Sequence, residues 1–400
     1  MGRSAATRFV TGVCISSFGD WLTTFALAVV LFNATKSVAV TAGYLLVRVA
    51  PRPLGAWLGG PLGDAASPRA ALVGAALGQG MVTAAIAVPL ALGRGYWAIF
   101  VLVGMSQLVG GSWQPLTSAM MARLAGAESR HSLNLVYSLS MSGMMLVAPA
   151  AGALLLPLGG AVPLVAGDAV SFAAAAGLFL SLPATPRIAG TSMTVRGAAT
   201  GGFAAVARQP ILRVITLGAF SATLVITALQ AALPALAAER FGSSADAGFC
   251  WAAVGLGGVI GSVIALWPRL QRPGVILPGI VVEIACIGGV ALAGAPAVDL
   301  LLLVGNTVAA NITTIESLVI VQSQAGETVG RVEGAVSTSR YLGMTTGATL
   351  ALLLALTLRW QVLVVILALA GLALLAGAGV RPQGSAPPLR APSPLGEIPE

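Results

Sequence analysis

Residues 70–92 read AALVGAALGQGMVTAAIAVPLAL, a mainly apolar run without a charged side chain. The hydrocarbon core of a bilayer is about 30 Å thick and an α-helix rises about 1.5 Å per residue, so about 20 apolar residues are needed to cross it. This run is long enough, and so are the flanked run Trp21 to Phe32 and the run Val362 to Val380. We interpret each of the three as a transmembrane helix.

The composition of the whole chain agrees with this interpretation. Hydrophobic residues make up 57% and charged residues 8% of the 400 residues, whereas about a quarter of a soluble domain is charged. Backbone polar groups in lipid must be hydrogen-bonded internally, and the runs are too long and too evenly apolar for the alternating strands of a β-barrel. We therefore expect an all-α membrane protein.

Twelve such stretches fill the chain almost end to end. The predicted helices are 9–33, 38–62, 69–92, 96–121, 131–157, 161–182, 211–238, 246–267, 274–293, 298–325, 332–358 and 361–380. Because the number of crossings is even, both ends of the chain are expected on the same side of the bilayer.

The basic residues give the orientation. The gaps on the side of the N-terminus hold Arg3, Arg8, Arg69, Arg123, Arg130, Arg187, Arg196, Arg208, Arg213, Arg269, Arg272, Arg331, Arg381 and Arg390, and the gaps on the other side hold Lys36, Arg94, Arg240 and Arg359. Basic residues favour the cytoplasmic side of a membrane. We expect a multi-pass protein of the cell (plasma) membrane with both termini in the cytoplasm.

The chain divides into two similar halves. The segment 183–210, rich in Gly, Thr, Ser and Arg, is predicted to be a cytoplasmic linker between six-helix bundles at 1–182 and 211–380. Gly143-Met144 recurs as Gly343-Met344, and Ala125-Gly126 recurs at the same offset, as a duplicated six-helix unit would require. The proline-rich segment 381–400 is predicted to be disordered. The predicted fold is therefore two pseudo-symmetric six-helix bundles.

Several classes of function are disfavoured by the residues present. Cys14, Cys250 and Cys286 all fall inside predicted helices, and His131 is the only histidine, so we expect neither a metal site nor a disulfide framework. No nucleotide-binding loop or catalytic motif is present, so we expect no cofactor and no enzyme activity. The net charge of +8 is spread over many gaps, so we expect no nucleic-acid partner.

Two opposite charges in the first two helices are the leading candidates for a functional site. Asp20 lies about 18 Å from Arg8 along one helix, and Arg48 lies about 18 Å from Lys36 along the next. A charged side chain at this depth is costly unless it faces protein, water or a partner. We predict that Asp20 and Arg48 face each other or share a wet cavity, with Thr24 on the same helical face as Asp20. An ion pair that only pins the two helices together is the alternative.

The second half carries its own intramembrane charges, at Glu283, Glu316 and Arg340. With Asp20 and Arg48 they form the predicted set for proton and substrate coupling. The polar and methionine side chains predicted to line a cavity are Thr24, Met141, Met145, Thr227, Gln230, Asn306, Thr313 and Tyr341. Methionine adapts to varied apolar ligands. Ordinary helix packing and interhelical hydrogen bonds are the alternative for any one of these residues.

Several short motifs add a resemblance to a known family. The loop from Gly60 to Arg69 is similar, through Gly60, Asp64 and Arg69, to the G-x-x-x-D-R-x-G-R-R loop of the major facilitator superfamily. Pro149 and Gly152 resemble a degenerate G-P-x-x-G motif of proton-coupled exporters. The resemblance covers nearly the whole chain and implies the major facilitator fold, with Asp64 contacting the helix that begins near residue 332.

Further motifs are similar to the branch of macrolide-efflux and enterobactin exporters. They are Ser17-Phe18-Gly19-Asp20, Arg48-Val49-Ala50-Pro51, Asp168-Ala169-Val170-Ser171-Phe172 and Gly330-Arg331-Val332. The resemblance implies two bundles that rock about a central cavity and open alternately to either side of the membrane.

These inferences lead to a predicted function. Since no nucleotide-binding domain is seen, uphill transport must draw on an ion gradient. We predict a monomeric exporter of amphipathic small molecules, drugs or secreted metabolites, that uses proton antiport. An importer or facilitator of a small polar solute, and a non-transporting membrane sensor on the same fold, remain as alternatives.

Overall fold

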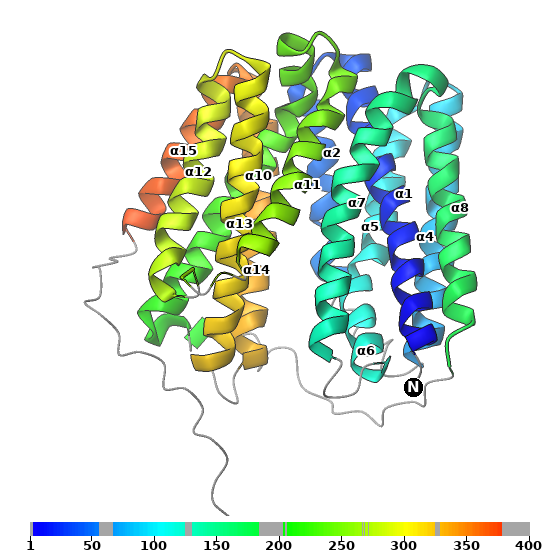
Figure 1. Cartoon of the computed structure of the whole chain (residues 1–400). Helices are drawn as coiled ribbons and strands as arrows, with labels where there is room; N and C mark the ends of the chain where they lie inside the picture. The colour runs from blue at the N-terminus through cyan, green and yellow to red at the C-terminus, as the bar shows by residue number, and fades with distance from the viewer. Residues whose placement is uncertain are drawn as a thin grey trace, which may run out of the picture.

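The computed structural model describes residues 3–55, 67–124, 130–183, 203–204, 206–265, 267, 269–270, 272–324 and 329–377. In these ranges all regular elements are α-helices or single 3-10 turns, as the sequence predicts (Figure 1). Residues Gly60 and Asp64 of the predicted gating loop, most of the predicted linker and the segment 381–400 lie outside the described ranges.

The helices follow the predicted spans closely. The N-terminal half contains α1 (Arg3–Thr35), α2 (Val38–Val49), α4 (Pro68–Ala91), α5 (Tyr96–Gly111), α6 (Trp113–Leu124), α7 (Arg130–Gly159) and α8 (Ala161–Leu180). The C-terminal half contains α10 (Pro210–Arg240), η1 (Ser244–Asp246), α11 (Ala247–Ile264), η2 (Pro273–Val275), α12 (Ile276–Leu292), α13 (Pro296–Gln324), α14 (Val329–Leu354) and α15 (Trp360–Gly377).

Two predicted spans are wrong in detail. The helix predicted over 38–62 is interrupted after Val49 by a turn at Ala50 and Pro51, a short helical stretch follows at 52–55, and residues 56–62 lie outside the described ranges. The helix predicted over 96–121 is two helices, α5 and α6, separated by a turn at Ser112. The backbone N–H of Ser112 donates to the Val109 carbonyl at 3.0 Å, and its hydroxyl donates to the same carbonyl at 2.7 Å. The break follows Gly110 and Gly111, and a Gly/Ser sequence is a common cause of helix kinks because Gly restrains the backbone little and Ser competes for its hydrogen bonds.

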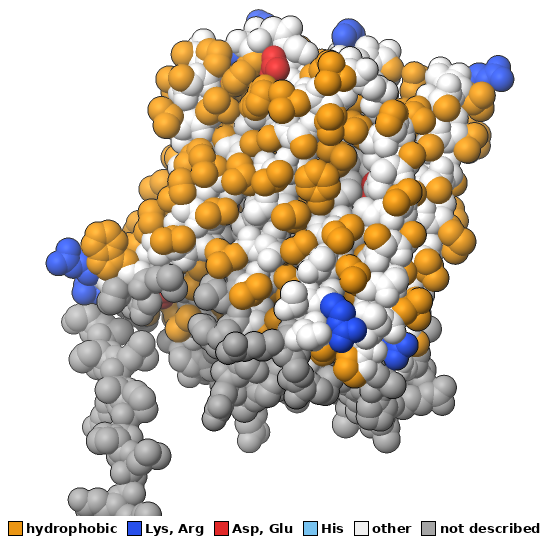
Figure 2. Space-filling model, turned by 45° about the vertical axis from the view of Figure 1, so that its right-hand side comes forward, with side chains coloured by type: hydrophobic (Ala, Val, Ile, Leu, Met, Phe, Trp, Pro, Cys, Tyr) orange, Lys and Arg blue, Asp and Glu red, His pale blue; other side chains and the backbone are white. Residues whose placement is uncertain are grey.

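The described helices suit a membrane. Nine of them are long and apolar enough to cross a bilayer by length and composition, counted over the described residues. Apolar side chains cover the middle of the molecular surface in Figure 2, whereas Lys and Arg appear at its two ends. α14 is also long, but Arg331, Glu333 and Arg340 interrupt its apolar character. The molecule thus has the outer surface of a polytopic membrane protein.

The helices pack as two bundles with matching internal contacts (Figure 1). In the N-terminal bundle α1 contacts α7 and α8, and α4 contacts α5 and α8. In the C-terminal bundle α10 contacts α14 and α15, and α12 contacts α13 and α15. Each pair occupies the same place in the chain order of its half, so the two bundles are pseudo-symmetric. Between the bundles, α2 contacts α14 and α7 contacts α11.

Several described contacts between the bundles lie in the half of the molecule away from the N-terminus. There, the Ser244 hydroxyl donates to the Asn33 side-chain oxygen at 2.7 Å, and the Trp21 and Trp251 rings lie 5.4 Å apart. Figure 1 shows the bundles close together at this end and farther apart at the end that carries the N-terminus. We call these two ends the opposite face and the N-terminal face.

Candidate functional site

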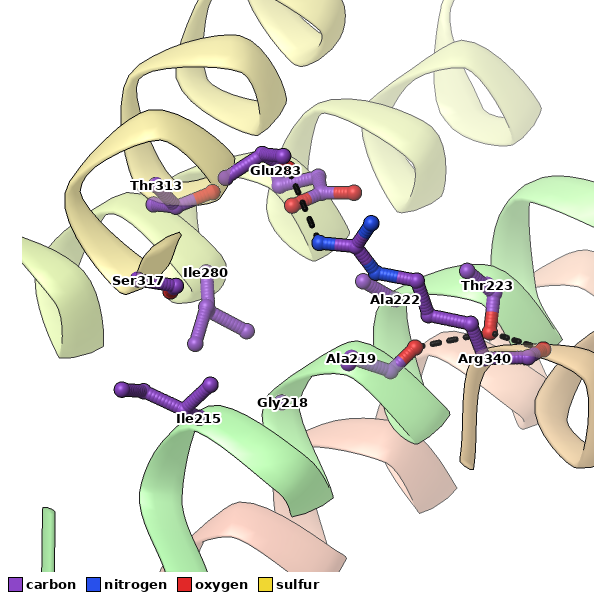
Figure 3. A pocket seen from close by; sticks show the side chains of 11 residues that line it. Ile215, Gly218, Ala219, Ala222, Thr223, Ile280, Glu283, Thr313, Ser317 and Arg340 are labelled. Carbon is purple, nitrogen blue, oxygen red and sulfur yellow. Dashed lines mark hydrogen bonds between the residues drawn. The ribbon is translucent and has the colours of Figure 1, made fainter. Parts of the chain in front are cut away.

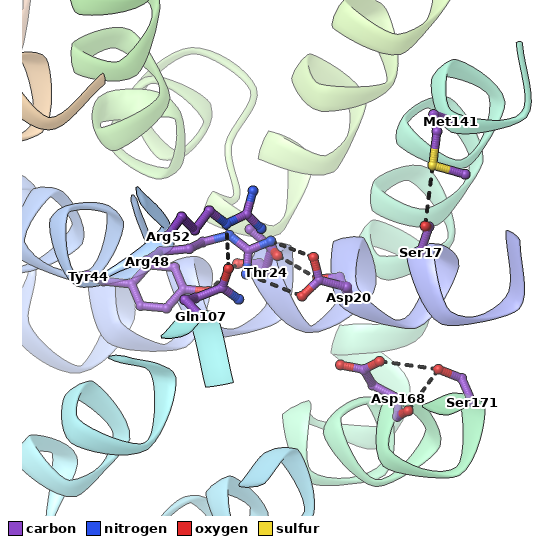
Figure 4. Close-up of polar contacts among 10 residues, drawn as sticks. All are labelled: Ser17, Asp20, Thr24, Tyr44, Arg48, Arg52, Gln107, Met141, Asp168 and Ser171. Atoms are coloured by element: carbon purple, nitrogen blue, oxygen red, sulfur yellow. Dashed lines mark hydrogen bonds and ion pairs between the residues drawn. The ribbon is translucent and has the colours of Figure 1, made fainter. Parts of the chain in front are cut away.

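The predicted pairing of Asp20 and Arg48 is confirmed. Arg48 Nη2 donates to Asp20 Oδ2 at 2.7 Å, and Nη1 donates to Oδ1 at 3.4 Å (Figure 4). Asp20 lies about 22 Å along α1 from Thr35 and about 25 Å from Arg3. The pair therefore sits near the middle of the helix, where charges are most costly and a two-pronged contact is most useful.

The hairpin of α1 and α2 explains how the two residues meet. Lys36, in a left-handed conformation with φ of 53°, and Ser37, whose hydroxyl accepts the Val40 N–H at 3.4 Å, reverse the chain between the helices. The register is fixed again deeper in the bundle, because the hydroxyl of the buried Tyr44 donates to the Thr24 carbonyl at 3.3 Å. Two consecutive antiparallel helices thus bring residues at similar depth together.

Arg52 also belongs to this site, although the sequence analysis did not include it. It follows the turn at Ala50 and Pro51, and its Nε donates to Oε1 of the buried Gln107 on α5 at 2.7 Å (Figure 4). Its spacing of four residues from Arg48 was the available signal, since residues four apart share a helical face.

Asp168 on α8 is a second residue near this site; the sequence analysis quoted it in a motif but did not include it among the site residues. It is 1% exposed and accepts a hydrogen bond from the Ser171 hydroxyl at 3.2 Å. Gly19 makes room for it, because a Cβ there would collide with Oδ1 of Asp168 and the Ser171 hydroxyl. In the described residues no basic nitrogen lies within 4 Å of Asp168. The motif containing Asp168 was visible in the sequence, but its neighbours were not.

In the C-terminal bundle, Glu283 and Arg340 line one pocket. Its other lining residues come from α10, α12 and α13: Ile215, Gly218, Ala219, Ala222, Thr223, Ile280, Thr313, Thr314 and Ser317. The Arg340 guanidinium points toward Glu283 in Figure 3, and its Nη2 donates to the Thr314 hydroxyl at 3.4 Å. The cavity volume is about 50 Å³, which is room for a few water molecules.

The other predicted coupling residue, Glu316, is placed differently. Its side chain is 3% exposed and lies outside the lining of this pocket. Asn306, predicted to line a cavity, is 3% exposed and its Nδ2 donates to the Glu283 carbonyl at 2.9 Å, which ties α13 to α12.

The remaining predicted lining residues fall into two groups. Thr24 and Thr227 are each 2% exposed and their hydroxyls donate to carbonyls of their own helices, so for these two the structure favours the alternative of packing and internal hydrogen bonding. Thr313 lines the pocket. Met141, Met145, Gln230 and Tyr341 are partly buried. The Ser17 hydroxyl lies 3.4 Å from the sulfur of Met141 (Figure 4).

The exporter-like motif of α7 lies at helix contacts. A Cβ on Gly152 would collide with the Phe25 ring of α1, and a Cβ on Gly248 of α11 would collide with the Pro149 carbonyl. These two motif residues therefore join α7 to its own bundle on one side and to the C-terminal bundle on the other. Arg69 of the predicted gating loop is in the first turn of α4.

The chemistry of the described residues is that of charge pairing and hydrogen bonding. Groups of three or more His, Cys, Asp or Glu suited to a metal are absent from the described ranges. The Asp20–Arg48 pair with the adjacent Arg52, and Glu283 with Arg340 in the pocket of the C-terminal bundle, can bind polar groups. The carboxylates among them can also exchange protons.

No protein-family model and no curated protein matches the chain. Solved structures do. The nucleoside transporter NupG, as a point mutant, superposes with a TM-score of 0.69 at 15% identity, covering 93% of this chain and 98% of NupG. A second NupG structure superposes with a TM-score of 0.67 at 12% identity, and the match covers 94% of this chain and 98% of NupG.

A bacterial homologue of the human lysosomal transporter Spinster, in an inward-facing and unoccupied conformation, gives a TM-score of 0.61 at 12% identity. The match covers 96% of this chain and 100% of the homologue. The chain has the all-α, two-bundle fold of these transporter structures, in agreement with the predicted fold class.

Proposed function

We propose that this chain is a membrane transporter that moves a small molecule by alternating access between its two bundles. The observation that carries the proposal is the Asp20–Arg48 ion pair, 2.7 Å long and halfway along α1, in a fold shared with transporters. Ionisable side chains are expensive at this depth, so each one that is present is by default a candidate functional residue.

The packing of the bundles supports alternating access. α7 and α11 meet through glycines at 248 and 255, whose missing side chains let the two helices approach closely. Such contacts separate with little loss of interdigitated side chains. Bundles joined mainly at the opposite face are suited to a state that is open toward the N-terminal face. By the distribution of Arg residues, that face is cytoplasmic.

Proton coupling follows from the pair itself. When a substrate draws Arg48 away from Asp20, the carboxylate loses its positive neighbour and its affinity for a proton rises. The carboxylates Glu283 and Glu316 offer further proton sites in the other bundle. A proton moving through the membrane potential supplies about 2.3 kcal/mol per 100 mV.

The direction of transport has two candidates. The resemblance to macrolide-efflux and enterobactin exporters favours export of amphipathic molecules by proton antiport, in which proton and substrate bind alternately. The superposition on NupG, a nucleoside transporter, supports a polar solute as the transported molecule, as in the second candidate, import or facilitated passage of a polar solute. The two candidates predict opposite movements of the same probe.

Cells that express the chain provide the test. We expect expression to lower the accumulation of an ethidium or antibiotic probe if the chain exports, and a protonophore to abolish the effect. Import would raise accumulation of the probe, and it would also respond to the protonophore. An accumulation that does not change with expression or with the Asp20→Asn variant, across a panel of apolar, polar and charged probes, would contradict transport.

A further inference from the structure

Two guanidinium groups, those of Arg48 and Arg52, lie next to each other near the boundary between the bundles (Figure 4). α2 packs against α14 and α10 of the other bundle. Arg52 is only partly buried. The pair is thus placed where a molecule between the bundles would meet it.

The charges around Arg48 and Arg52 do not balance. Asp20 is paired with Arg48, whereas Arg52 directs its Nε to the neutral amide of Gln107. Within the described ranges no carboxylate oxygen lies within 4 Å of Arg52. Asp168, a further carboxylate of this bundle, lies on the other side of α1 from Arg52 in Figure 4. Among the described residues, one positive charge therefore remains without an ion-pair partner at mid-depth, where that is costly.

The geometry of Arg52 suits an anion. The hydrogen bond to Gln107 uses Nε and fixes the plane of the guanidinium, so the two Nη groups are held in a set direction. A planar fork of this kind binds carboxylate, sulfonate or phosphate groups through two parallel hydrogen bonds. The site is about 21 Å along the chain from Val38 in helical rise, so it lies well below the level of lipid headgroups.

We infer that Arg52, with Arg48 beside it, binds an anionic group of the transported molecule. The inference rests on the proposed function, because it names the class of molecule that passes between the bundles: an organic anion. It also bears on direction. A proton on Asp20 neutralises the carboxylate that is paired with Arg48, so proton and anion favour each other's binding. This coupling favours movement of proton and anion in the same direction, as in proton-coupled import, over antiport.

Two probes that differ in one group test the inference. 1-Anilinonaphthalene-8-sulfonate and N-phenyl-1-naphthylamine share their aromatic rings, and the first alone has a sulfonate. Binding of each to the purified full chain in a neutral detergent is measured by equilibrium dialysis, with protein-free micelles subtracted. We expect the wild type to prefer the sulfonate. Arg52→Gln should weaken sulfonate binding about tenfold or more, as expected for loss of a charge-assisted hydrogen bond, and leave the neutral probe within about twofold.

Three further variants sharpen the result. Arg52→Lys keeps the charge without the fork, and we expect an intermediate loss. Arg94→Gln removes an exposed arginine between α4 and α5 and should change nothing. Asp20→Asn leaves both arginines without a carboxylate, so it should tighten sulfonate binding, an increase that loss of structure would not produce. Binding of the neutral probe reports whether each variant is folded.

Different outcomes overturn different claims. Equal affinity of the wild type for the two probes, or an unchanged preference in Arg52→Gln, overturns the anion site. An Arg52→Gln variant that loses both probes while Arg52→Lys keeps both at wild-type strength overturns it as well, since the charge would then serve folding. If the expected binding is found but proteoliposomes never move the sulfonate, the proposed transport fails and the anion site stands.

Discussion

The ion pair of Asp20 and Arg48 joins α1 to α2, and we propose that it also takes part in transport. Their ion pair has exposed side-chain fractions of 23% and 10%, so it is neither fully desolvated nor free in water. Removing one partner of a buried pair costs about 3–5 kcal/mol, because it leaves the other charge alone, whereas removing both can be nearly neutral. The single and double variants therefore separate the two roles.

We expect Asp20→Ala and Arg48→Ala each to lower thermal stability in detergent. The double variant should lose about 1–3 kcal/mol less free energy of unfolding than the two single losses added together. All three should lose proton-driven transport if the pair has the coupling role. Melting temperature and protonophore-sensitive transport are the two measurements. A double variant that recovers both stability and transport would reduce the pair to a clamp between α1 and α2.

Gly19 and Asp168 form a second coupled position at the residue scale. Because a Cβ on Gly19 would collide with the Asp168 carboxylate and the Ser171 hydroxyl, we expect Gly19→Ala to destabilise the N-terminal bundle by about 1–3 kcal/mol. Gly74, whose Cβ would have nothing within 4 Å, is the matched control, and Gly74→Ala should be neutral or slightly stabilising. Thermal unfolding of the two variants checks this. Equal stability of the Gly19→Ala and Gly74→Ala variants would show that α1 and α8 can move apart at this contact without a loss of stability.

At the scale of elements, α11 is held between two helices by glycines on different faces. Gly248 and Gly255 face α7 of the other bundle, whereas Gly257 and Gly261 face backbone carbonyls of α13 in the same bundle. The spacing of these glycines in the sequence shows that close contact is possible. Only the packing shows that the first two lie at a contact between the bundles and the second two at a contact within one bundle. The proposed transport motion would break the first contact and keep the second.

Gly248→Ala is expected to weaken the contact between the bundles, since the new Cβ would collide with the backbone carbonyl of Pro149. If the variant favours the state in which the bundles are separated at the opposite face by about 1–2 kcal/mol, the population of that state rises about tenfold. Labelling of a cysteine placed at the 6% exposed Ser244, with Cys14, Cys250 and Cys286 replaced, should become correspondingly faster. Gly257→Ala is the matched control on the same helix, and its labelling rate should equal that of the parent. The same acceleration in both variants would indicate general loosening of α11.

At the scale of the whole molecule, the proposed alternating access requires the bundles to separate at the opposite face in each transport cycle. The described contacts between them there include the hydrogen bond from Ser244 to Asn33 and the packing of Trp21 on Trp251. A covalent link across this end should therefore stop transport without unfolding either bundle.

We expect an Asn33→Cys, Ser244→Cys variant without native cysteines to lose transport when it is joined by a short methanethiosulfonate cross-linker, and to recover when the link is reduced. The starting side chains are 2.7 Å apart, so a short reagent suffices. Transport of the proteoliposome-bound protein before linking, after linking and after reduction is the measurement. A linked protein that still transports at its full rate would contradict alternating access about this end.

The charged side chains are also divided between the two bundles. Asp20, Arg48 and Arg52 belong to the N-terminal bundle, whereas Glu283 and Arg340 line a pocket of the C-terminal bundle. Rocking of the bundles changes the distance between the two groups, and with it the field that each one feels. Coupling between substrate and ion needs such a link between local charge and global shape.

The sequence by itself determined the membrane setting, the spans of most helices and the pairing of Asp20 with Arg48. Apolar length decides insertion, and two consecutive helices joined by the short turn at Lys36 must run side by side, so residues at equal depth can meet. Tertiary structure alone decided the partners that come from distant parts of the chain. Gln107 beside Arg52, Gly19 opposite Asp168 and Arg340 in the pocket with Glu283 depend on which faces of nonconsecutive helices meet, and in a chain so evenly apolar the helical pattern does not mark those faces.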